Sequence, residues 1–209
     1  MFRRFAAVIL SAILLSPGWL GMTGMTLLIG FVPLLWVSAS YDDTRRSWWG
    51  MFGWATLAFV LWNAAWVTDR CEEWTAVLWN ALTIWWIWYA TPVGPPAATL
   101  ASTTMNMIAF MLFHTVSKKA PKALAYVTLV TAWITTEYWY TVGDFSWPWL
   151  ILGNGFSHEV WAVQWYEYTG VFGGTLWVLL SNILIFEALQ ARRSTRRWAV
   201  AACSVALPM

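Results

Sequence analysis

The chain has 209 residues, of which 60% are hydrophobic and 11% are charged, and its formal net charge is +2. Soluble domains carry about one quarter charged residues, so this composition excludes an ordinary water-soluble globular protein. The apolar residues form blocks of roughly 17 to 22 residues, the length of an α-helix that crosses the hydrocarbon core of a membrane. We therefore predict an all-α fold, a polytopic bundle of about six to seven transmembrane helices.

The first two predicted helices form a pair near the N-terminus. Residues 2–16 have the basic head and short apolar stretch of a signal peptide, but Pro17 and Gly18 lead directly into a second apolar run. A cleaved signal peptide would show a small-residue cleavage site at that point. We therefore predict that the first segment is retained, and that helices over 5–20 and 21–38 turn near Pro17 and Gly18.

The basic residues predict the orientation of the helices. Short basic loops stay on the cytoplasmic side, so the N-terminus and every basic cluster should face the cytoplasm, with an even number of crossings between successive clusters. Three apolar blocks, 48–68, 74–91 and 97–117, separate the second cluster from the third, which is one too many. Residues 74–91 are the shortest block and are rich in Trp, so we predict an interfacial or re-entrant segment there. The clusters are Arg3-Arg4, Arg45-Arg46, Lys118-Lys119 with Lys122, and Arg192-Arg193 with Arg196-Arg197.

Two further blocks, 123–142 and 171–189, lie between the last two basic clusters and predict another helical pair. Residues 143–170 would then lie on the outer side. The final run, 198–209, is shorter than the roughly 17 to 25 residues that span a membrane. A helix that ended within lipid would leave its last carbonyl groups unpaired. We therefore predict a membrane domain over 1–197, with 198–209 as the start of a further, incomplete helix of a protein that continues.

Aromatic rings gather around a helix breaker in the outer segment. Pro148 stops any helix there, and Trp147 and Trp149 flank it. Indole rings commonly mark the membrane interface, so these two residues fit either an interfacial belt or a specific contact with a lipid substrate.

Two polar groups inside predicted membrane helices are further candidates. Glu137 is ionisable, which makes it a functional candidate, although it lies near a helix end from which it could reach the headgroups. Asn182 could either form an interhelical hydrogen bond or contact a substrate. His114 and His158 adjoin polar loops, and we interpret both as solvated.

A series of motifs follows in the second half of the chain. It consists of Glu137-Tyr138-Trp139, Pro148-Trp149-Leu150, Gly153, Gln164-Trp165, Thr169-Gly170-Val171-Phe172-Gly173 and Ser181-Asn182-Ile183-Leu184. In order and spacing, this series resembles the membrane region of the apolipoprotein N-acyltransferase family. The earlier run Trp85-Trp86-Ile87-Trp88 is similar to the Bacteroidetes-type branch of that family, whereas the acidic stretch 69–73 departs from its pattern.

The resemblance implies a transferase of the bacterial inner membrane. Such an enzyme moves an acyl chain from a phospholipid donor to the N-terminal diacylglyceryl-cysteine of a lipoprotein acceptor. In the family, a cysteine assisted by a glutamate and a lysine performs the reaction on a nitrilase-like domain outside the cytoplasm. No lysine follows Lys122, and neither Cys71 nor Cys203 has the surroundings of an activated thiol. We therefore assign no catalytic residue and expect the chain to be inactive alone.

The resemblance also implies roles for residues of the membrane region. Glu137, Trp147, Trp149, Asn154 and Asn182 are expected to line the lateral opening through which acyl chains reach the active site. We expect no cofactor, no metal site and no nucleic-acid partner. Two alternatives stay open, namely a non-catalytic membrane protein that binds lipid or a lipoprotein, and a small transporter.

Overall fold

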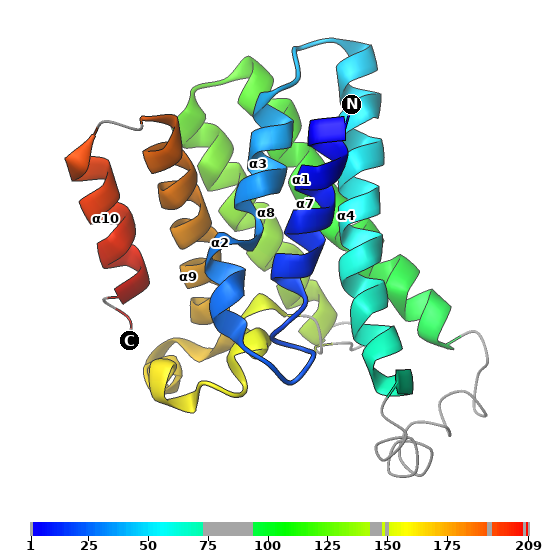
Figure 1. Ribbon diagram of the computed structural model, residues 1–209, viewed down its shortest axis with the longest axis vertical. Coiled ribbons are helices and arrows are strands. Elements are labelled where there is room, and N and C mark those ends of the chain that lie inside the picture. The colour runs from blue at the N-terminus through cyan, green and yellow to red at the C-terminus, as the bar shows by residue number, and fades with distance from the viewer. Residues whose placement is uncertain are drawn as a thin grey trace.

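The structure is a computed structural model, and it describes residues 2–72, 94–142, 148, 151–191, 194–206 and 208. Every regular element in these ranges is an α-helix or a short 3-10 helix, as Figure 1 shows. The predicted all-α class is therefore confirmed for the described part of the chain.

The first two predicted helices form a pair, but the second of them is broken. The first helix ends just before Pro17, whose ring cannot continue it, and the Leu20 amide closes the turn by donating to the Pro17 carbonyl. The returning segment breaks at Phe31, two residues before Pro33, which lacks the amide hydrogen that a continuous helix needs. The elements are α1 (Phe2–Leu15), η1 (Gly24–Thr26), α2 (Leu27–Gly30) and α3 (Val32–Ala39).

The later helices follow the predicted apolar blocks closely. Gly170 interrupts the helix that contains it with a φ of 65° and a ψ of −173°, so the uninterrupted part begins at Val171, the predicted first residue. The prediction of an interfacial segment over 74–91 falls outside the described residues. The bounds are α4 (Arg45–Glu72), α7 (Gly94–Lys119), α8 (Lys122–Val142), α9 (Tyr166–Gln190) and α10 (Thr195–Ala206).

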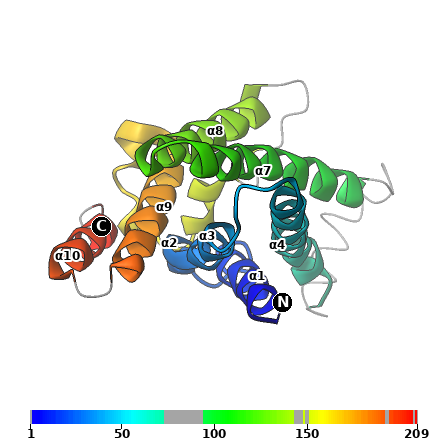
Figure 2. The same cartoon turned by 90° about the horizontal axis from the view of Figure 1, so that it is seen from above.

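The helices close into a ring, which Figure 2 shows from above. α1 packs against α4, α4 against α7, α7 against α8, and α8 against α9. The broken α2–α3 segment completes the ring, because it contacts both α9 and α1. α10 lies outside the ring against α9. The first and second halves of the chain therefore share one core.

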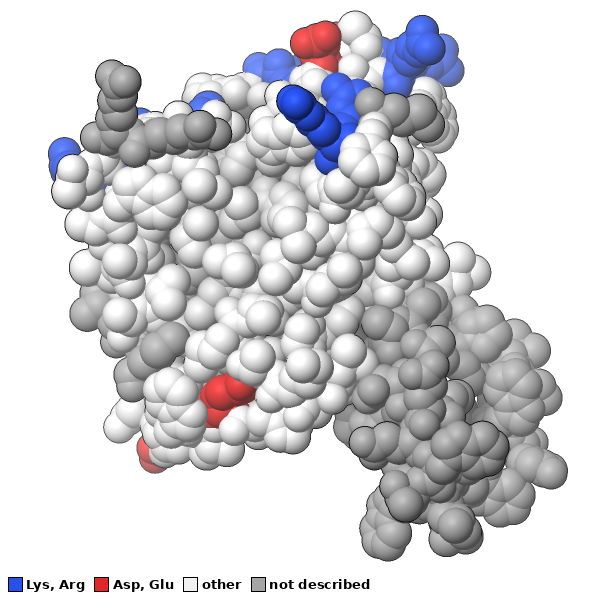
Figure 3. Space-filling model, viewed as in Figure 1, with Lys and Arg blue, Asp and Glu red and all other residues white. Residues whose placement is uncertain are grey.

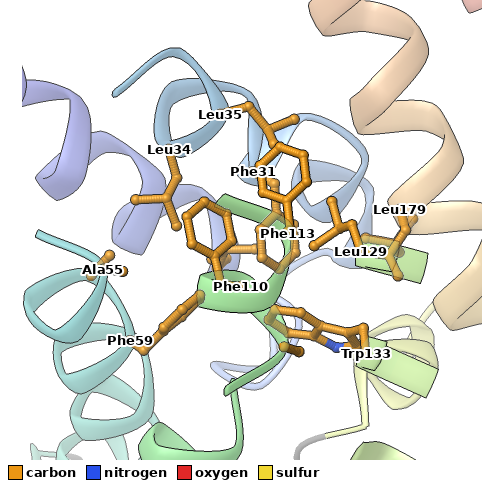
Figure 4. Packing of buried hydrophobic residues seen from close by; sticks show 14 of the residues in the cluster. Phe31, Leu34, Leu35, Ala55, Phe59, Phe110, Phe113, Leu129, Trp133 and Leu179 are labelled. Atoms are coloured by element: carbon orange, nitrogen blue, oxygen red, sulfur yellow. The ribbon is translucent and has the colours of Figure 1, made fainter. Parts of the chain in front are cut away.

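Aromatic side chains fill the centre of this ring (Figure 4). The ring of Phe31 is fully buried and meets Trp133 edge-on, with 4.9 Å between the ring centroids. Phe59 lies 5.7 Å from Trp133 and 5.9 Å from Phe110 by the same measure. Each such pair contributes about 0.5 to 1.5 kcal/mol beyond the burial of its area. These contacts join the α2–α3 junction to α4, α7 and α8.

Charged side chains lie at the two ends of the molecule. On the face drawn in Figure 3, a broad band without Lys, Arg, Asp or Glu separates the two ends. The described members of all four basic clusters fall at one end, where α1, α4, α8 and α10 begin and α7 and α9 end. This arrangement is the one expected if the chain crosses the bundle an even number of times between successive basic clusters. We call this end the basic end.

One helix in the described ranges, α9, is long and apolar enough to cross a membrane, with a mean hydropathy of 1.7. The multi-pass arrangement and its orientation in a membrane stay predictions.

Two basic residues hold the last turn of α3 at the basic end. The final carbonyl groups of a helix have no partner within it. Arg4 donates to the Ser40 carbonyl at 2.8 Å, and the ammonium group of Lys118 donates to the Ser38 carbonyl at 2.9 Å. Positive charge at a helix C-terminus also complements the helix dipole. The two cations thus join α1 and α7 to α3.

Candidate functional site

Glu137 is the centre of a buried hydrogen-bond network that joins α8, α9 and the outer segment. Its side chain is only 2% exposed. Oε1 accepts hydrogen bonds from the indole N–H of Trp133 at 3.0 Å and from the Leu152 amide at 2.8 Å. Oε2 accepts one from the Thr175 hydroxyl at 2.5 Å. The alternative in which Glu137 reaches the lipid headgroups is therefore wrong, because protein donors surround its carboxylate.

The network continues into the outer segment through η3 (Leu152–Phe156). The Gly153 amide donates to the Thr175 hydroxyl at 3.3 Å, so this hydroxyl accepts one hydrogen bond and donates another to Glu137. The Tyr166 hydroxyl, at the start of α9, donates to the Gly153 carbonyl at 2.9 Å. Two consecutive backbone amides of η3 are thus held by buried side chains of α8 and α9.

The outer segment also packs against the N-terminal turn, a contact that the sequence did not predict. The backbone of Gly155 approaches Gly18 and Gly24 so closely that a Cβ atom on either residue would overlap the Gly155 carbonyl oxygen. Glu159, which precedes η4 (Val160–Ala162), is 8% exposed and accepts the Gly24 amide with both carboxylate oxygens at 3.2 Å. Two segments that are far apart in the sequence thereby form one end of the bundle, opposite the basic end.

Asn182 closes the break between α2 and α3. Its side chain is 1% exposed, its Oδ1 accepts from the Phe31 amide at 2.8 Å, and its Nδ2 donates to the Leu27 carbonyl at 2.7 Å. In a continuous α-helix these two backbone groups, four residues apart, would bond to each other directly. The side-chain amide therefore takes the place of one missing helical hydrogen bond. Asn182 makes the interhelical contact that was one of its two predicted roles.

The predicted site residues do not form one compact cluster. Asn154 lies in η3 beside the Glu137 network, but its side chain is exposed and donates to the Pro148 carbonyl at 2.8 Å. Asn182 lies about two helical turns beyond Thr175 along α9 and takes part in a different contact.

The two predicted indoles, Trp147 and Trp149, lie outside the described residues, so their proposed part in the site stays a prediction.

The interpretation of His114 as a solvated side chain is wrong. Its ring is 1% exposed, and its Nδ1 lies 2.7 Å from the hydroxyl oxygen of Ser38. The end of α7 lies beside the end of α3, where Ser38 contacts both His114 and Lys118, so the ring is buried although a basic loop follows it. His158 is exposed, as predicted.

Thr175 and Tyr166 are site residues that the sequence interpretation missed. A hydroxyl within an otherwise apolar helix is a usable signal, because polar groups in membrane helices seek partners on neighbouring helices. Tyr166 gives no such signal, since several aromatic residues surround it in the sequence.

The Glu137 network is suited to holding the backbone of the outer segment in place. Both oxygens of the carboxylate accept hydrogen bonds from the protein, and Glu137 and its donor Thr175 are buried away from the surface. Within the described ranges, no three His, Cys, Asp or Glu side chains gather in a way that could hold a metal ion. The thiol of Cys203 is exposed on α10.

Comparison with known proteins places this network within a recognised domain. The family model of the apolipoprotein N-acyltransferase N-terminal domain matches residues 70–184. A protein named apolipoprotein N-acyltransferase from Chlorobaculum tepidum is 29% identical over 124 residues. The aligned stretch covers 59% of this chain but only 23% of that relative, so the match spans less than a quarter of its length. No solved structure matches the chain.

Proposed function

The chain belongs to the apolipoprotein N-acyltransferase N-terminal domain family, and from this membership we propose that it is the membrane portion of such an enzyme. In this proposal the enzyme transfers an acyl chain from a phospholipid to the N-terminal diacylglyceryl-cysteine of lipoproteins. The chain lies in the inner membrane of a bacterium and crosses it several times, with its N-terminus in the cytoplasm. The proposed membrane domain comprises residues 1–197, with α10 (Thr195–Ala206) at its end.

The observation that carries the proposal is the network centred on Glu137. It lies within the matched residues and fastens the outer segment to α8 and α9. Three donors of the protein hold this carboxylate, and the side chain is only 2% exposed, which favours a structural role over contact with substrate. We therefore propose that Glu137 holds the outer segment rigidly, as the surface beside which acyl transfer takes place.

We further propose how the predicted site residues divide this work. Trp147, Trp149 and Asn154 contact the lipid substrates in the outer segment. Glu137 and Asn182 act indirectly, through the backbone that each of them holds in place. The uncharged band between the two charged ends supports the access of acyl chains from the side.

The chemical step belongs to another part of the enzyme in this proposal. Attack on an acyl ester needs an activated nucleophile and a donor that stabilises the developing oxyanion. We propose that a nitrilase-like domain supplies the cysteine, glutamate and lysine for this step. The membrane portion then presents the lipid and the lipoprotein to that domain.

An acyl-transfer assay tests this proposal. The chain, purified in detergent, is mixed with phospholipid and a diacylglyceryl peptide, and is compared with a version extended through the reading frame that follows. We expect transfer only by the extended form. Transfer by neither form, with lipid still bound to the short one, would instead favour a non-catalytic membrane protein that binds lipid or a lipoprotein.

A pair of tryptophan variants of the extended form tests the division of roles. Trp149→Ala is expected to reduce the rate of acyl transfer about tenfold, the effect of losing one well-placed aromatic contact of about 1.4 kcal/mol. Trp198→Ala removes an exposed indole at the basic end and should leave the rate unchanged. Equal effects of the two variants would mean that Trp149 is only one of many interfacial indoles.

A further inference from the structure

A cleft of about 410 Å³ opens at the basic end of the bundle, between the start of α4 and the end of α7. Three cationic side chains line it, those of Arg45, Lys118 and Lys119, together with the two carboxylates of Asp42 and Asp43. The cleft therefore offers both signs of charge within one cavity. It lies at the opposite end of the bundle from the Glu137 network, which begins near the end of α8.

Most of these charged side chains have no hydrogen-bond or close ion-pair partner in the described part of the chain. Lys118 donates to the Ser38 carbonyl, as described above. The side chains of Arg45, Lys119, Asp42 and Asp43 form no hydrogen bond or ion pair with the rest of the described chain; the ion pairs found there both involve Glu187. Opposite charges that line one cavity without pairing to each other remain available to a ligand that carries both signs.

Indole rings form one wall of the cleft. Trp48 stacks on Phe52 with 5.8 Å between the ring centroids, and its N–H donates to the Thr115 hydroxyl at 3.0 Å, which holds the ring in place. Trp49 also lines the cleft and is 56% exposed. In a membrane, an exposed indole beside basic residues marks the level of the lipid headgroups. The cleft therefore lies where a headgroup would meet it.

We propose that this cleft binds the headgroup of an aminophospholipid. Arg45 and Lys119 bind the phosphate, and Asp42 and Asp43 accept hydrogen bonds from the primary ammonium group. Position alone does not select this headgroup, but the carboxylates do, because a purely anionic headgroup would meet two like charges in the same cavity. A quaternary ammonium group has no N–H to donate to them. The inference rests on the membrane placement proposed above, and not on acyl transfer.

A titration of the full chain in a neutral detergent tests the site. The probes are dihexanoyl phosphatidylethanolamine, dihexanoyl phosphatidylcholine and dihexanoyl phosphatidylglycerol, and binding is followed by calorimetry. We expect the phosphatidylethanolamine to bind about tenfold more tightly than either of the others, the effect of charge-assisted hydrogen bonds that only its headgroup completes. Equal affinities for the three lipids, or tightest binding of the phosphatidylglycerol, would overturn the proposal.

Variants of exposed side chains test separately the binding of the phosphate group and of the ammonium group. Arg45→Gln with Lys119→Gln should weaken phosphatidylethanolamine binding about tenfold. Asp42→Asn with Asp43→Asn should abolish the preference over phosphatidylcholine. Arg46→Gln is the matched control, since Arg46 is exposed next to Arg45 but does not line the cleft, and it should bind like the unaltered chain. If Arg46→Gln weakened phosphatidylethanolamine binding as much as Arg45→Gln with Lys119→Gln does, the effect would come from the net positive charge of this end. That result would overturn the site.

Two more arms distinguish a lipid site from a phosphate site and from loss of folding. Inorganic phosphate and glycerophosphoethanolamine should compete at least tenfold more weakly than the phosphatidylethanolamine, because they lack acyl chains. Inorganic phosphate that competes equally well would overturn the lipid assignment. Helix content by circular dichroism should be the same in all variants, since the altered side chains are exposed. Selective lipid binding with no acyl transfer by any form would overturn the proposed function and leave this site intact. Acyl transfer without selective phosphatidylethanolamine binding would overturn the site and leave the proposed function intact.

Discussion

Glu137, Thr175 and Asn182 show how single buried side chains decide the shape of this protein. Each one accepts a hydrogen bond from a backbone amide away from water. An unpaired buried donor or acceptor costs about 1 to 3 kcal/mol, and more in hydrocarbon. The stability effect of such a residue is therefore set by the groups that its removal would leave unpaired.

Substitution of Glu137 should show this cost directly. Glu137→Ala leaves the Trp133, Leu152 and Thr175 donors without their acceptor, so we expect the free energy of unfolding to fall by about 3 kcal/mol or more. Glu137→Gln keeps the size and one acceptor oxygen, and should lose less. Thermal unfolding in detergent measures both. Equal losses in the two variants would show that volume, and not hydrogen bonding, is what Glu137 supplies.

Two buried asparagines offer a matched test. Asn182→Leu removes the side-chain acceptor of the Phe31 amide and the donor to the Leu27 carbonyl, so we expect a loss of about 2 to 4 kcal/mol and faster hydrogen exchange at the Phe31 amide. Asn106 is also buried, but its Nδ2 has no partner in the described part of the chain. Asn106→Leu should therefore be neutral or stabilising. If both residues served only to fill space, the two variants would change the free energy of unfolding by similar amounts.

At the scale of the element, the helices end where prolines and glycines interrupt them. Pro17 follows the end of α1, and Pro121 precedes the start of α8. These residues act locally, through a missing amide hydrogen or a restricted φ, so the sequence predicts their effects well. Gly170 acts in the same local way, because its φ of 65° and ψ of −173° form a combination that is essentially open to glycine alone.

A second matched pair of variants tests the break in α9. A Cβ atom at either Gly170 or Gly53 would meet nothing within 4 Å, so crowding is absent at both positions. Gly170→Ala should destabilise by about 1 to 3 kcal/mol, because alanine must adopt a strained backbone. Gly53→Ala, inside α4, should stabilise by up to about 1 kcal/mol through helix propensity. Unfolding midpoints that move in the same direction would contradict this reading of Gly170.

The break at Phe31 shows where prediction from the sequence stops. The run 21–38 is apolar throughout and predicts one helix, and Pro33 alone does not say how the freed backbone groups are paired. Their partner, Asn182, lies 151 residues beyond Phe31. The contact of Gly155 with Gly18 and Gly24 has the same character. Contacts of this kind depend on how the ring of helices closes, which local patterns do not specify.

The site was predicted in part for the same reason. Glu137 could be identified because an ionisable group in an apolar helix is unusual, whatever its partners are. Its partner Thr175 resembles many other threonines in the sequence until the packing of α8 against α9 is known. The prediction for His114 was wrong because a basic loop follows it in the sequence, whereas in the fold its ring is buried and contacts Ser38 of α3.

At the scale of the whole molecule, the basic clusters distinguish one end of the helical bundle from the other. The described members of the four basic clusters gather at one end, while the outer segment and the N-terminal turn form the other. If the bundle crosses the inner membrane as proposed, the basic end faces the cytoplasm.

Cysteine labelling in intact bacterial cells tests this direction. In a background with Cys71 and Cys203 replaced by Ser, a cysteine is placed at Lys119 or at His158, both exposed positions at opposite ends. We expect a membrane-impermeant maleimide to label Cys at position 158 in intact cells, and at position 119 only after the inner membrane is opened. Labelling of both positions from the same side would contradict the multi-pass orientation.

The hydrogen bonds of Asn182 at the break between α2 and α3 have a consequence for how the protein folds during synthesis. A ribosome adds about 5 to 20 residues per second, so Asn182 emerges roughly 8 to 30 s after Phe31. During this interval the Phe31 amide and the Leu27 carbonyl must be paired in some other way, with each other or with water. The N-terminal hairpin therefore reaches its final bend only when α9 joins the bundle, and the last helix of the ring completes the shape of the first segment to be synthesised.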